Sequence, residues 1–254
     1  ATWIFCAVPS THLRSVLSDV KQQSPVAAAA RWVMMTKGIE QQTLLLPTHV
    51  LNEVFQTTVN CAVLAGPNFA VELVQRALTA TTIASTDQRL LNDLTALVSN
   101  NYFTTVPSCD LTGVQLGGAL KNVIAVMVGI AVGAGYTHEN TKAYLITQGL
   151  DELAQLIIAL CGKRETVYGL SGLGDLLLTC SSTLSKNLRA GILIGKGLSL
   201  EQIQAEHFAV LPEGIGTLKS LNDLMNRCKL DLPLCQGAYA CVYGGKTFKD
   251  VFDL

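Results

Sequence analysis

Charged residues are scarce in this sequence. Only 15% of its 254 residues are Asp, Glu, Lys or Arg, and the formal net charge is −1. Nucleic acids and anionic membrane faces attract proteins through clustered positive charge, so neither is expected as a partner. Hydrophobic residues make up 49% of the chain, which predicts a large core in one large or two ordinary domains. Basic groups that matter to function must therefore act locally, for example on one phosphate.

Cysteine pairs of the metal-binding kind are also lacking. None of the eight cysteines belongs to a C-x-x-C motif or lies at ligand spacing from one of the four histidines, so no metal site is expected. Most of the cysteines lie in apolar runs, as reduced thiols commonly do in cytoplasmic proteins. The N-terminus shows no basic region followed by a hydrophobic core and a cleavage site. We therefore expect a cytoplasmic location.

Long hydrophobic runs are limited to one, at residues 113–135, and this run is apolar on nearly every face of a helix. It predicts a buried helix that carries one lysine, Lys121. Burying an unpaired ammonium costs on the order of several kcal/mol, and desolvation lowers its pKa toward the range of a physiological base. Lys121 is therefore the first candidate for catalysis, although a core helix whose lysine reaches the surface explains the pattern too. A membrane span is disfavoured by Gln115, Lys121 and Asn122 within the run.

The first 108 residues alternate between short apolar strands and helical segments. This alternation predicts a doubly wound parallel sheet, which binds ligands at the carboxyl ends of its strands. Pro9-Ser10, Lys37-Gly38 and Gly66-Pro67-Asn68 fall at such ends, where ordinary turn chemistry is the alternative explanation. The predicted strands are 2–8, 31–36, 61–65, 80–85 and 102–106, and the predicted helices are 11–20, 48–55, 69–76 and a segment capped by Asp87 that ends near 99.

Helical periodicity dominates after Pro107. We place a domain boundary near residue 108, which divides the chain into an α/β domain at 1–108 and an all-helical domain at 109–254. Lys121 would then point into the cleft between the two domains, where ligand sites concentrate. The predicted helices are 113–132, 138–161, 184–194, 200–205, 214–228 and 233–243.

Two polar segments interrupt the helical half. The glycine-rich segment 169–175 ends in Asp175, which is either a helix cap or a carboxylate partner for Lys121. No strand precedes this segment, so it is not read as a dinucleotide-binding turn. Ser185, Lys186 and Asn187 offer a hydroxyl, an ammonium, an amide and free backbone N–H groups at a helix start, which suits a phosphate, although a plain N-cap explains them nearly as well.

Five motifs in this order resemble one known family. They are TKG at 36–38, GPNFAVE at 66–72, VQLGGALKNVIA at 114–125, GLGDLLLTCSSTLSKNLRAG at 172–191 and LPEG at 211–214. Together they are similar to bacterial NAD(P)-dependent glycerol-3-phosphate dehydrogenase. The resemblance implies a Rossmann-like nucleotide-binding domain, a helical substrate domain, and NAD or NADP as cofactor. The apolar helical half would offer the surface of a homodimer.

The resemblance also implies the reaction and its residues. Hydride transfer between the nicotinamide ring and C2 would interconvert sn-glycerol 3-phosphate and dihydroxyacetone phosphate, a step that feeds glycerophospholipid synthesis. Lys121 would exchange the proton at the C2 oxygen, and Asp175 would order Lys121. The implied substrate-binding residues are Lys37, Gly66, Asn68, Lys121, Asp175, Ser185, Lys186 and Asn187, and the implied cofactor-binding residues are Lys37, Ala70, Lys186, Leu211 and Glu213.

Three features depart from the family pattern. Lys186 stands where the family has arginine, and VLPEG is one residue longer than the usual VVEG. The 254 residues contain no G-x-G-x-x-G turn to seat a pyrophosphate, so the predicted nucleotide-binding domain is incomplete and lacks the first βαβ unit. Two alternatives therefore stay open: a truncated remnant that acts only by association, and a related two-domain hydroxyacid dehydrogenase with another substrate.

Overall fold

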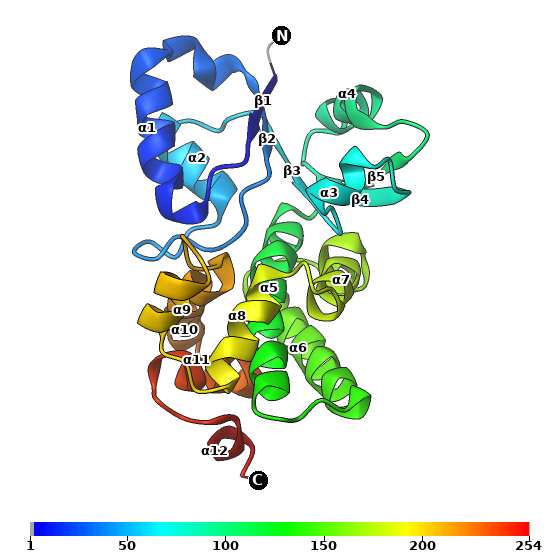
Figure 1. Ribbon diagram of the computed structural model, residues 1–254. Helices are drawn as coiled ribbons and strands as arrows, with labels where there is room; N and C mark the ends of the chain where they lie inside the picture. Colours follow the sequence, from blue (N-terminus) through cyan, green and yellow to red (C-terminus); the bar gives the residue numbers. More distant parts are fainter. Residues whose placement is uncertain (1–2, 254) are drawn as a thin grey trace.

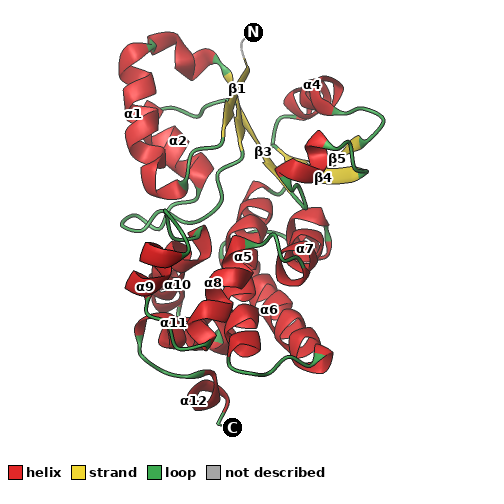
Figure 2. Ribbon diagram, viewed as in Figure 1, coloured by secondary structure: helices red, strands yellow, loops and turns green. Residues whose placement is uncertain are grey.

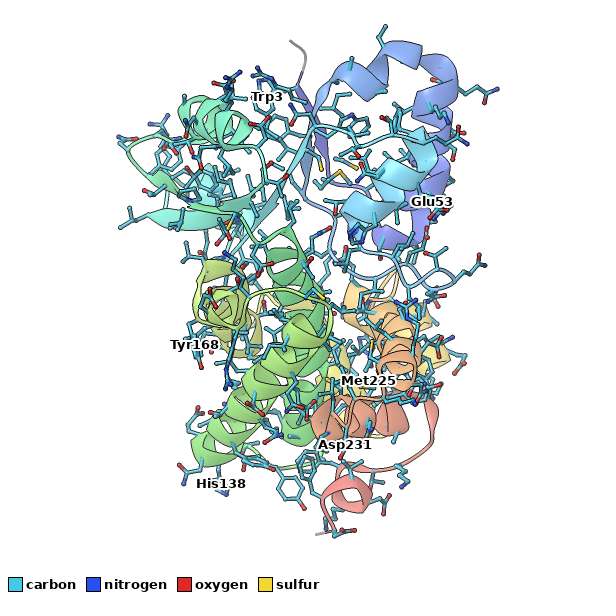
Figure 3. The ribbon with its side chains drawn as sticks, turned by 180° about the vertical axis from the view of Figure 1, so that it is seen from behind. Trp3, Glu53, His138, Tyr168, Met225 and Asp231 are labelled. Carbon is cyan, nitrogen blue, oxygen red and sulfur yellow. The ribbon has the colours of Figure 1, made fainter. Side chains whose placement is uncertain are left out.

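A sheet flanked by helices lies above a bundle of helices in the computed structural model, which describes residues 3–253 (Figure 1). Among the described residues, strands occur only in the upper part of the molecule as it is drawn (Figure 2). Seen from behind, Trp3 on the first strand and His138, just before the helix α6 (Glu139–Ala159), lie at opposite ends of the molecule (Figure 3). The expected α/β half and all-helical half are therefore both present.

The sheet has five strands in the order β1-β2-β3-β4-β5, and it is mixed rather than wholly parallel. β1 to β2, β2 to β3 and β4 to β5 are parallel pairs, whereas β3 and β4 are antiparallel. The prediction of a parallel sheet was thus wrong at one pair. The strands are β1 (Trp3–Cys6), β2 (Arg31–Met34), β3 (Cys61–Ala65), β4 (Thr79–Ala84) and β5 (Phe103–Ser108).

The antiparallel pairing of β3 with β4 has a geometric cause. A parallel connection must carry the chain back along the whole length of the strand, usually on a helix. Here α3 spans only Ala70–Val74, shorter than the predicted 69–76. Five helical residues cover about 7.5 Å, whereas a strand of five residues covers about 17 Å. The chain therefore returns beside β3 in the opposite direction as β4.

Helices cover both faces of the sheet, as a doubly wound arrangement requires. On one face, Trp32 and Met34 of β2 pack in a cluster with residues of α1 (Leu13–Gln23) and α2 (Pro47–Phe55). On the other face, Val33 packs in a cluster with residues of α4 (Gln88–Val98). Successive residues of a strand point to opposite faces, which explains why β2 is buried on both sides. The predicted cap at Asp87 is confirmed, since its carboxylate accepts hydrogen bonds from the N–H groups of Arg89 and Leu90.

One helix, α5 (Leu111–Gly133), forms the centre of the lower part, and its residues 113–131 are all buried. By length and composition it is apolar enough to cross a membrane, but 89% of its most apolar window lies inside the protein. The predicted helices lie where expected, whereas α7 and α12 were not predicted. The surrounding helices are α6 (Glu139–Ala159), α7 (Asp175–Ser181), α8 (Lys186–Gly195), α9 (Leu200–Glu206), α10 (Glu213–Cys228), α11 (Pro233–Tyr243) and α12 (Phe248–Phe252).

Glycines bring α5 and α8 into backbone contact. A Cβ atom added at Gly191 would lie 2.1 Å from the carbonyl oxygen of Val126, and one at Gly195 would lie 2.2 Å from that of Ile130. Only residues without a side chain permit this approach. Because the two helices run parallel, the start of α8 lies beside the middle of α5, where Asn187 contacts Asn122, the residue after Lys121.

The two halves also share a core. Ile39 and Leu46, in the loop after β2, belong to the same buried cluster as the α5 side chains. The Ser220 hydroxyl of α10 donates to the carbonyl oxygen of Ile39 at 2.9 Å. Gln115 of α5 exchanges hydrogen bonds with Thr48 of α2. The upper half is therefore anchored to the helical half on both sides of the junction.

Candidate functional site

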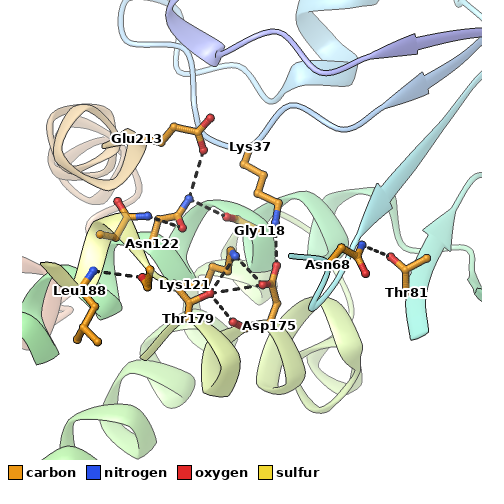
Figure 4. A network of polar contacts seen from close by, with 12 residues as sticks. Lys37, Asn68, Thr81, Gly118, Lys121, Asn122, Asp175, Thr179, Leu188 and Glu213 are labelled. Atoms are coloured by element: carbon orange, nitrogen blue, oxygen red, sulfur yellow. Dashed lines mark hydrogen bonds and ion pairs between the residues drawn. The ribbon is translucent and has the colours of Figure 1, made fainter. Parts of the chain in front are cut away.

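The predicted lysine–carboxylate pair is present at the junction of the two halves (Figure 4). Lys121 Nζ donates to Asp175 Oδ1 at 2.5 Å and to Thr179 Oγ1 at 2.9 Å. Lys121 is 6% exposed and Asp175 is 1% exposed. The cap position of α7 is Gly174, and no side chain caps this helix. The Asp175 carboxylate is therefore a partner of Lys121 and does not cap its own helix.

A second lysine reaches the same carboxylate from the sheet. Lys37 follows β2, and its Nζ donates to Asp175 Oδ2 at 2.9 Å. One buried carboxylate thus holds two ammonium groups, one from each half of the molecule. The excess positive charge is suited to a phosphorylated ligand or to a developing oxyanion.

This environment changes the acidity of Lys121. Burial of the ammonium lowers the pKa of Lys121 to about 8, and repulsion from Lys37 acts in the same direction. Attraction to Asp175 opposes the shift without cancelling it. A lysine with this pKa can give up and regain a proton near physiological pH.

Close backbone contacts carry Asp175 to this position. A Cβ atom added at Gly117, one turn before Lys121, would lie 2.3 Å from the carbonyl oxygen of Ser171. Ser171 lies in a single turn of π-helix, Leu170–Gly174, directly before Asp175. A glycine at position 117 therefore lets this turn lie against α5, so that Asp175 faces Lys121.

Asp110 ties the same segment to the start of α5. Its carboxylate accepts hydrogen bonds from the N–H groups of Gly113 and Lys163, at 2.9 Å each, and from the Thr166 hydroxyl at 2.6 Å. It therefore caps α5 and fixes residues 163–166, which lead into the π-helical turn, against the same helix end.

An amide chain links α5, α8 and α10. Asn187 Nδ2 donates to Asn122 Oδ1 at 2.9 Å, and the N–H group of Gly214 donates to Asn187 Oδ1 at 2.9 Å. Asn122 Nδ2 lies 3.5 Å from Glu213 Oε2, a long hydrogen bond. These hydrogen bonds place Asn187 and Glu213 beside Asn122, the residue that follows Lys121.

The three residues at 185–187 do not behave alike. Ser185 is buried, and its hydroxyl caps α8 by accepting from the N–H group of Leu188 at 3.2 Å. Ser185 is therefore the cap of α8, and accepting this hydrogen bond does not use the O–H donor of the same hydroxyl. Lys186 and Asn187 line a cleft.

Gly66 and Asn68 follow β3, at the same sheet edge as Lys37. β2 and β3 are parallel with Met34 opposite Val63, so the same register extended by three residues places Lys37 beside Gly66. Asn68 Nδ2 donates to the Thr81 hydroxyl at 2.8 Å, while Asn68 Oδ1 is buried without a hydrogen-bond partner. An unpaired buried acceptor costs about 1–3 kcal/mol, so Oδ1 is a candidate contact for a ligand.

A cleft of about 1010 Å³ opens between the carboxyl end of β1 and the helical half. Lys121 and Asp175 are not among its lining residues; the amide chain at Asn187 and Glu213 connects them to it. Its lining includes Ser10, Arg14, Lys186, Asn187, Leu211 and Glu213.

Most of the residues selected from the sequence thus lie at the junction, with two differences. Ala70 is exposed at the first position of α3 and does not line the cleft. The sequence reasoning did not select Thr179, Asn122 or Thr81 as site residues. Two of these had a usable signal, since Thr179 is one helical turn after Asp175 and Asn122 follows Lys121 directly. Thr81 had none, because its contact depends on the antiparallel pairing of β3 and β4.

Among residues 3–253, no three His, Cys, Asp or Glu side chains gather into a metal site.

A helix-flanked sheet that meets a helical bundle at a buried lysine–carboxylate pair suits an enzyme that binds a nucleotide at the strand ends and moves a proton nearby. Comparison with known proteins specifies the class. Residues 1–91 match the family model described as NAD-dependent glycerol-3-phosphate dehydrogenase N-terminus, and residues 110–253 match the model of its C-terminus. The chain belongs to the NAD-dependent glycerol-3-phosphate dehydrogenase family.

Individual relatives agree. The chain is 40% identical over 250 residues to a protein of Pseudomonas fluorescens (strain SBW25) named glycerol-3-phosphate dehydrogenase NAD(P)+, covering 98% of this chain and 72% of that one. It is 39% identical over its full length to the protein of the same name from Ectopseudomonas mendocina (strain ymp), of which it covers 73%. The crystal structure of glycerol-3-phosphate dehydrogenase from Coxiella burnetii matches with a TM-score of 0.91 at 28% identity, over 100% of this chain and 76% of that one.

Proposed function

We propose that this chain interconverts sn-glycerol 3-phosphate and dihydroxyacetone phosphate with NAD or NADP. The observation that carries the proposal is the buried contact of Lys121 with Asp175, completed by Lys37 from the other half of the molecule. Family membership supports the substrate and the cofactor.

Lys121 would move the proton at the C2 oxygen. In the direction of oxidation, its neutral amine takes the proton of the C2 hydroxyl; in the direction of reduction, its ammonium returns a proton to the C2 oxygen. Asp175 and Thr179 hold Nζ by hydrogen bonds. The Lys37 ammonium would stabilise negative charge that develops at the same oxygen.

Lys186 and Asn187, with the start of α8, would hold the phosphate. The first turn of a helix offers unpaired N–H groups and partial positive charge to an anion. Ser185 would cap α8 and donate its O–H to the phosphate, because the hydrogen bond from Leu188 uses only an acceptor lone pair of the hydroxyl. Gly66 and Asn68 would contact the opposite end of the substrate.

The residues present fit the nicotinamide end of a dinucleotide. The cleft of about 1010 Å³ joins the carboxyl end of β1 to Lys186, Leu211 and Glu213, and clefts at such strand ends are the usual dinucleotide site. When bound, the nicotinamide ring would accept or supply the hydride at C2. Lys186, Leu211 and Glu213 would border the cofactor from the helical half, and Lys37 from the sheet half.

We further propose a division of labour between residues 1–108, which would bind the nucleotide, and residues 109–254, which would bind the substrate and carry Lys121.

A cytoplasmic location is supported by the eight cysteines, all in the described part of the chain and all free thiols. A homodimer is supported by large exposed apolar side chains on the helical half, such as Tyr144, Ile158 and Leu184. Supply of glycerophospholipid synthesis would follow from the product.

Cofactor absorbance tests the proposal. The chain should oxidise NADH or NADPH when dihydroxyacetone phosphate is added, and Lys121→Met should lower kcat by about 10²–10⁴-fold. Lys249→Met, on the exposed side of α12, is the matched control and should keep wild-type activity. A Lys121→Met variant within tenfold of wild type would refute the assigned role. A folded wild-type chain with no activity would favour the remnant, and activity confined to another hydroxyacid would favour the alternative enzyme.

A further inference from the structure

A second, smaller cavity plays no part in the proposed function. It has a volume of about 320 Å³ and opens between the end of β5 and residues 163–171 of the helical half. Cys109, Lys163 and Ser171 are among the residues that line it. None of the residues assigned above to the substrate, the cofactor or the proton lines this cavity.

The hydroxyl of Ser171 has no partner. Ser171 is 1% exposed, and its Oγ is buried without a hydrogen bond. Buried polar atoms are normally paired, either within the protein or with a bound molecule. Because Ser171 also lines the cavity, its unpaired hydroxyl indicates a polar group that arrives with a ligand.

Cys109 brings a reactive group to the same cavity. Its thiol is free and exposed, and Lys163 Nζ donates to Cys109 Sγ at 3.0 Å. This hydrogen bond raises the pKa of Lys163, so the lysine keeps its charge. Thiols attack disulfides as thiolates, and an ammonium bonded to the sulfur favours that charged form. Lys163 contacts Cys109 although Cys161, which is also exposed, lies much nearer to it in the chain.

The groups around the cavity limit which disulfide fits. An ammonium has three donors, of which Lys163 gives one to the sulfur, and the Ser171 hydroxyl is free to donate; both suit a carboxylate. The carboxylate of Glu165 also lines the cavity and suits an amino group. We propose that Cys109 is a modification site that takes up a small peptide disulfide carrying both carboxylates and an amino group.

The reaction is a thiol–disulfide exchange. The Cys109 thiolate attacks one sulfur of the peptide disulfide, whose S–S bond breaks as the bond between Cys109 and the peptide forms. Cys109 is oxidised, and the other half of the disulfide leaves as a thiolate that takes up the proton lost by Cys109. A free thiol reverses the modification by the same exchange.

The adduct would lie beside residues that position the lysine–carboxylate pair. Asp110, directly after Cys109, accepts a hydrogen bond from the N–H group of Lys163 at 2.9 Å. The chain then runs from Lys163 through the π-helical turn to Asp175. Resting on the function proposed above, we expect the adduct to lower kcat by about tenfold, because a small misplacement of a catalytic group is costly.

Mass spectrometry after timed exposure to glutathione disulfide tests the site, with Cys161 as the reference in the same chain. Cys109 should form the mixed disulfide about tenfold or more faster than Cys161. Lys163→Met should abolish this preference, and Lys249→Met, the matched surface control, should keep it. Ser171→Ala should slow Cys109 about threefold with glutathione disulfide, but not with hydroxyethyl disulfide, which has no charged group.

Equal rates at the two cysteines, or an unchanged preference in Lys163→Met, would overturn the site. An unchanged rate in Ser171→Ala with glutathione disulfide would overturn recognition of the peptide by the cavity.

Activity gives a separate readout of the effect on kcat. Modified wild type should lose activity and regain it with dithiothreitol, whereas Cys109→Ser should keep its activity under the same treatment. Full activity after complete modification would overturn the effect on kcat. An unmodified chain without activity would refute the proposed function, while the rates of mixed-disulfide formation would still decide the modification site.

Discussion

At the scale of single residues, the site depends on one carboxylate shared by two lysines. Asp175 bonds Lys121 from α5 and Lys37 from the end of β2. Removing one partner of such a buried cluster leaves an uncompensated charge, which is costlier than the pair itself is favourable. The arrangement holds the amine of Lys121, the proposed proton carrier, and makes the junction electropositive at the same time.

The acidity of Lys121 predicts opposite pH profiles for the two directions of the reaction. Oxidation of glycerol 3-phosphate needs the neutral amine, so its kcat/KM should rise with pH and level off above about 8, the pKa of Lys121. Reduction of dihydroxyacetone phosphate needs the ammonium, so its kcat/KM should fall over the same range. Initial rates in both directions, measured from pH 6 to about 10, check this. Two profiles that move in the same direction would contradict it.

Lys186 provides a second prediction at this scale. A lysine keeps the positive charge of the family's arginine but loses its planar, bidentate contact with phosphate. We expect Lys186→Arg to lower the KM for dihydroxyacetone phosphate by about 2–10-fold. Lys249→Arg serves as the surface control. An unchanged KM for both the substrate and the cofactor in Lys186→Arg would show that a point charge suffices here.

At the scale of elements, the distance between α5 and the π-helical turn decides whether Asp175 reaches Lys121. Asp110 fixes one end of this contact through three hydrogen bonds, and Gly117 permits backbone contact with Ser171 at the other. The site is thus positioned by packing between elements distant in sequence.

Two adjacent glycines in α5 test this idea with the same substitution. Gly117→Ala would place Cβ 2.3 Å from a backbone oxygen, and we expect a loss of about 1–3 kcal/mol in the free energy of unfolding together with reduced kcat. At Gly118 the nearest atom would be Lys37 Cγ at 3.5 Å, an ordinary contact. Gly118→Ala should therefore be neutral or stabilise the helix by up to about 1 kcal/mol.

Urea unfolding and steady-state kinetics on the two variants make the comparison. Equal stability and activity in both would mean that the π-helical turn moves away from α5 without cost.

At the scale of the whole molecule, the two halves share one hydrophobic core. We therefore expect them to unfold together in a single transition. Ile39 comes from the sheet half in sequence, yet it is 2% exposed within the cluster around α5. Its loop also contributes Leu46 to that cluster and accepts a hydrogen bond from Ser220. The hydrophobic core therefore continues across the domain boundary that was predicted near residue 108.

Ile39→Ala tests this coupling. We expect it to lower the free energy of unfolding by about 2–5 kcal/mol, as for other buried aliphatic truncations, and to do so within a single transition. Val26, in the same half, is 77% exposed, so Val26→Ala should change stability by less than about 0.5 kcal/mol. Denaturation followed by circular dichroism and by tryptophan fluorescence should give coincident curves. A transition that separates helix loss from the tryptophan signal would show that the halves unfold independently.

The sequence determined the elements and the chemistry of this protein. Apolar periodicity located the strands and the long helices, and a lysine in an apolar helix singled out Lys121 as the candidate reactive group, because burying a charge is expensive. Neither result needs long-range contacts, since both depend on residues adjacent in the chain.

Tertiary structure alone decided how these elements meet. The antiparallel pairing of β3 with β4 follows from the short α3, and it brings Thr81 to Asn68. The contact between Lys37 and Asp175 joins residues 138 positions apart. Such contacts depend on register, backbone approach and competition among donors, which are fixed only when the whole chain has packed.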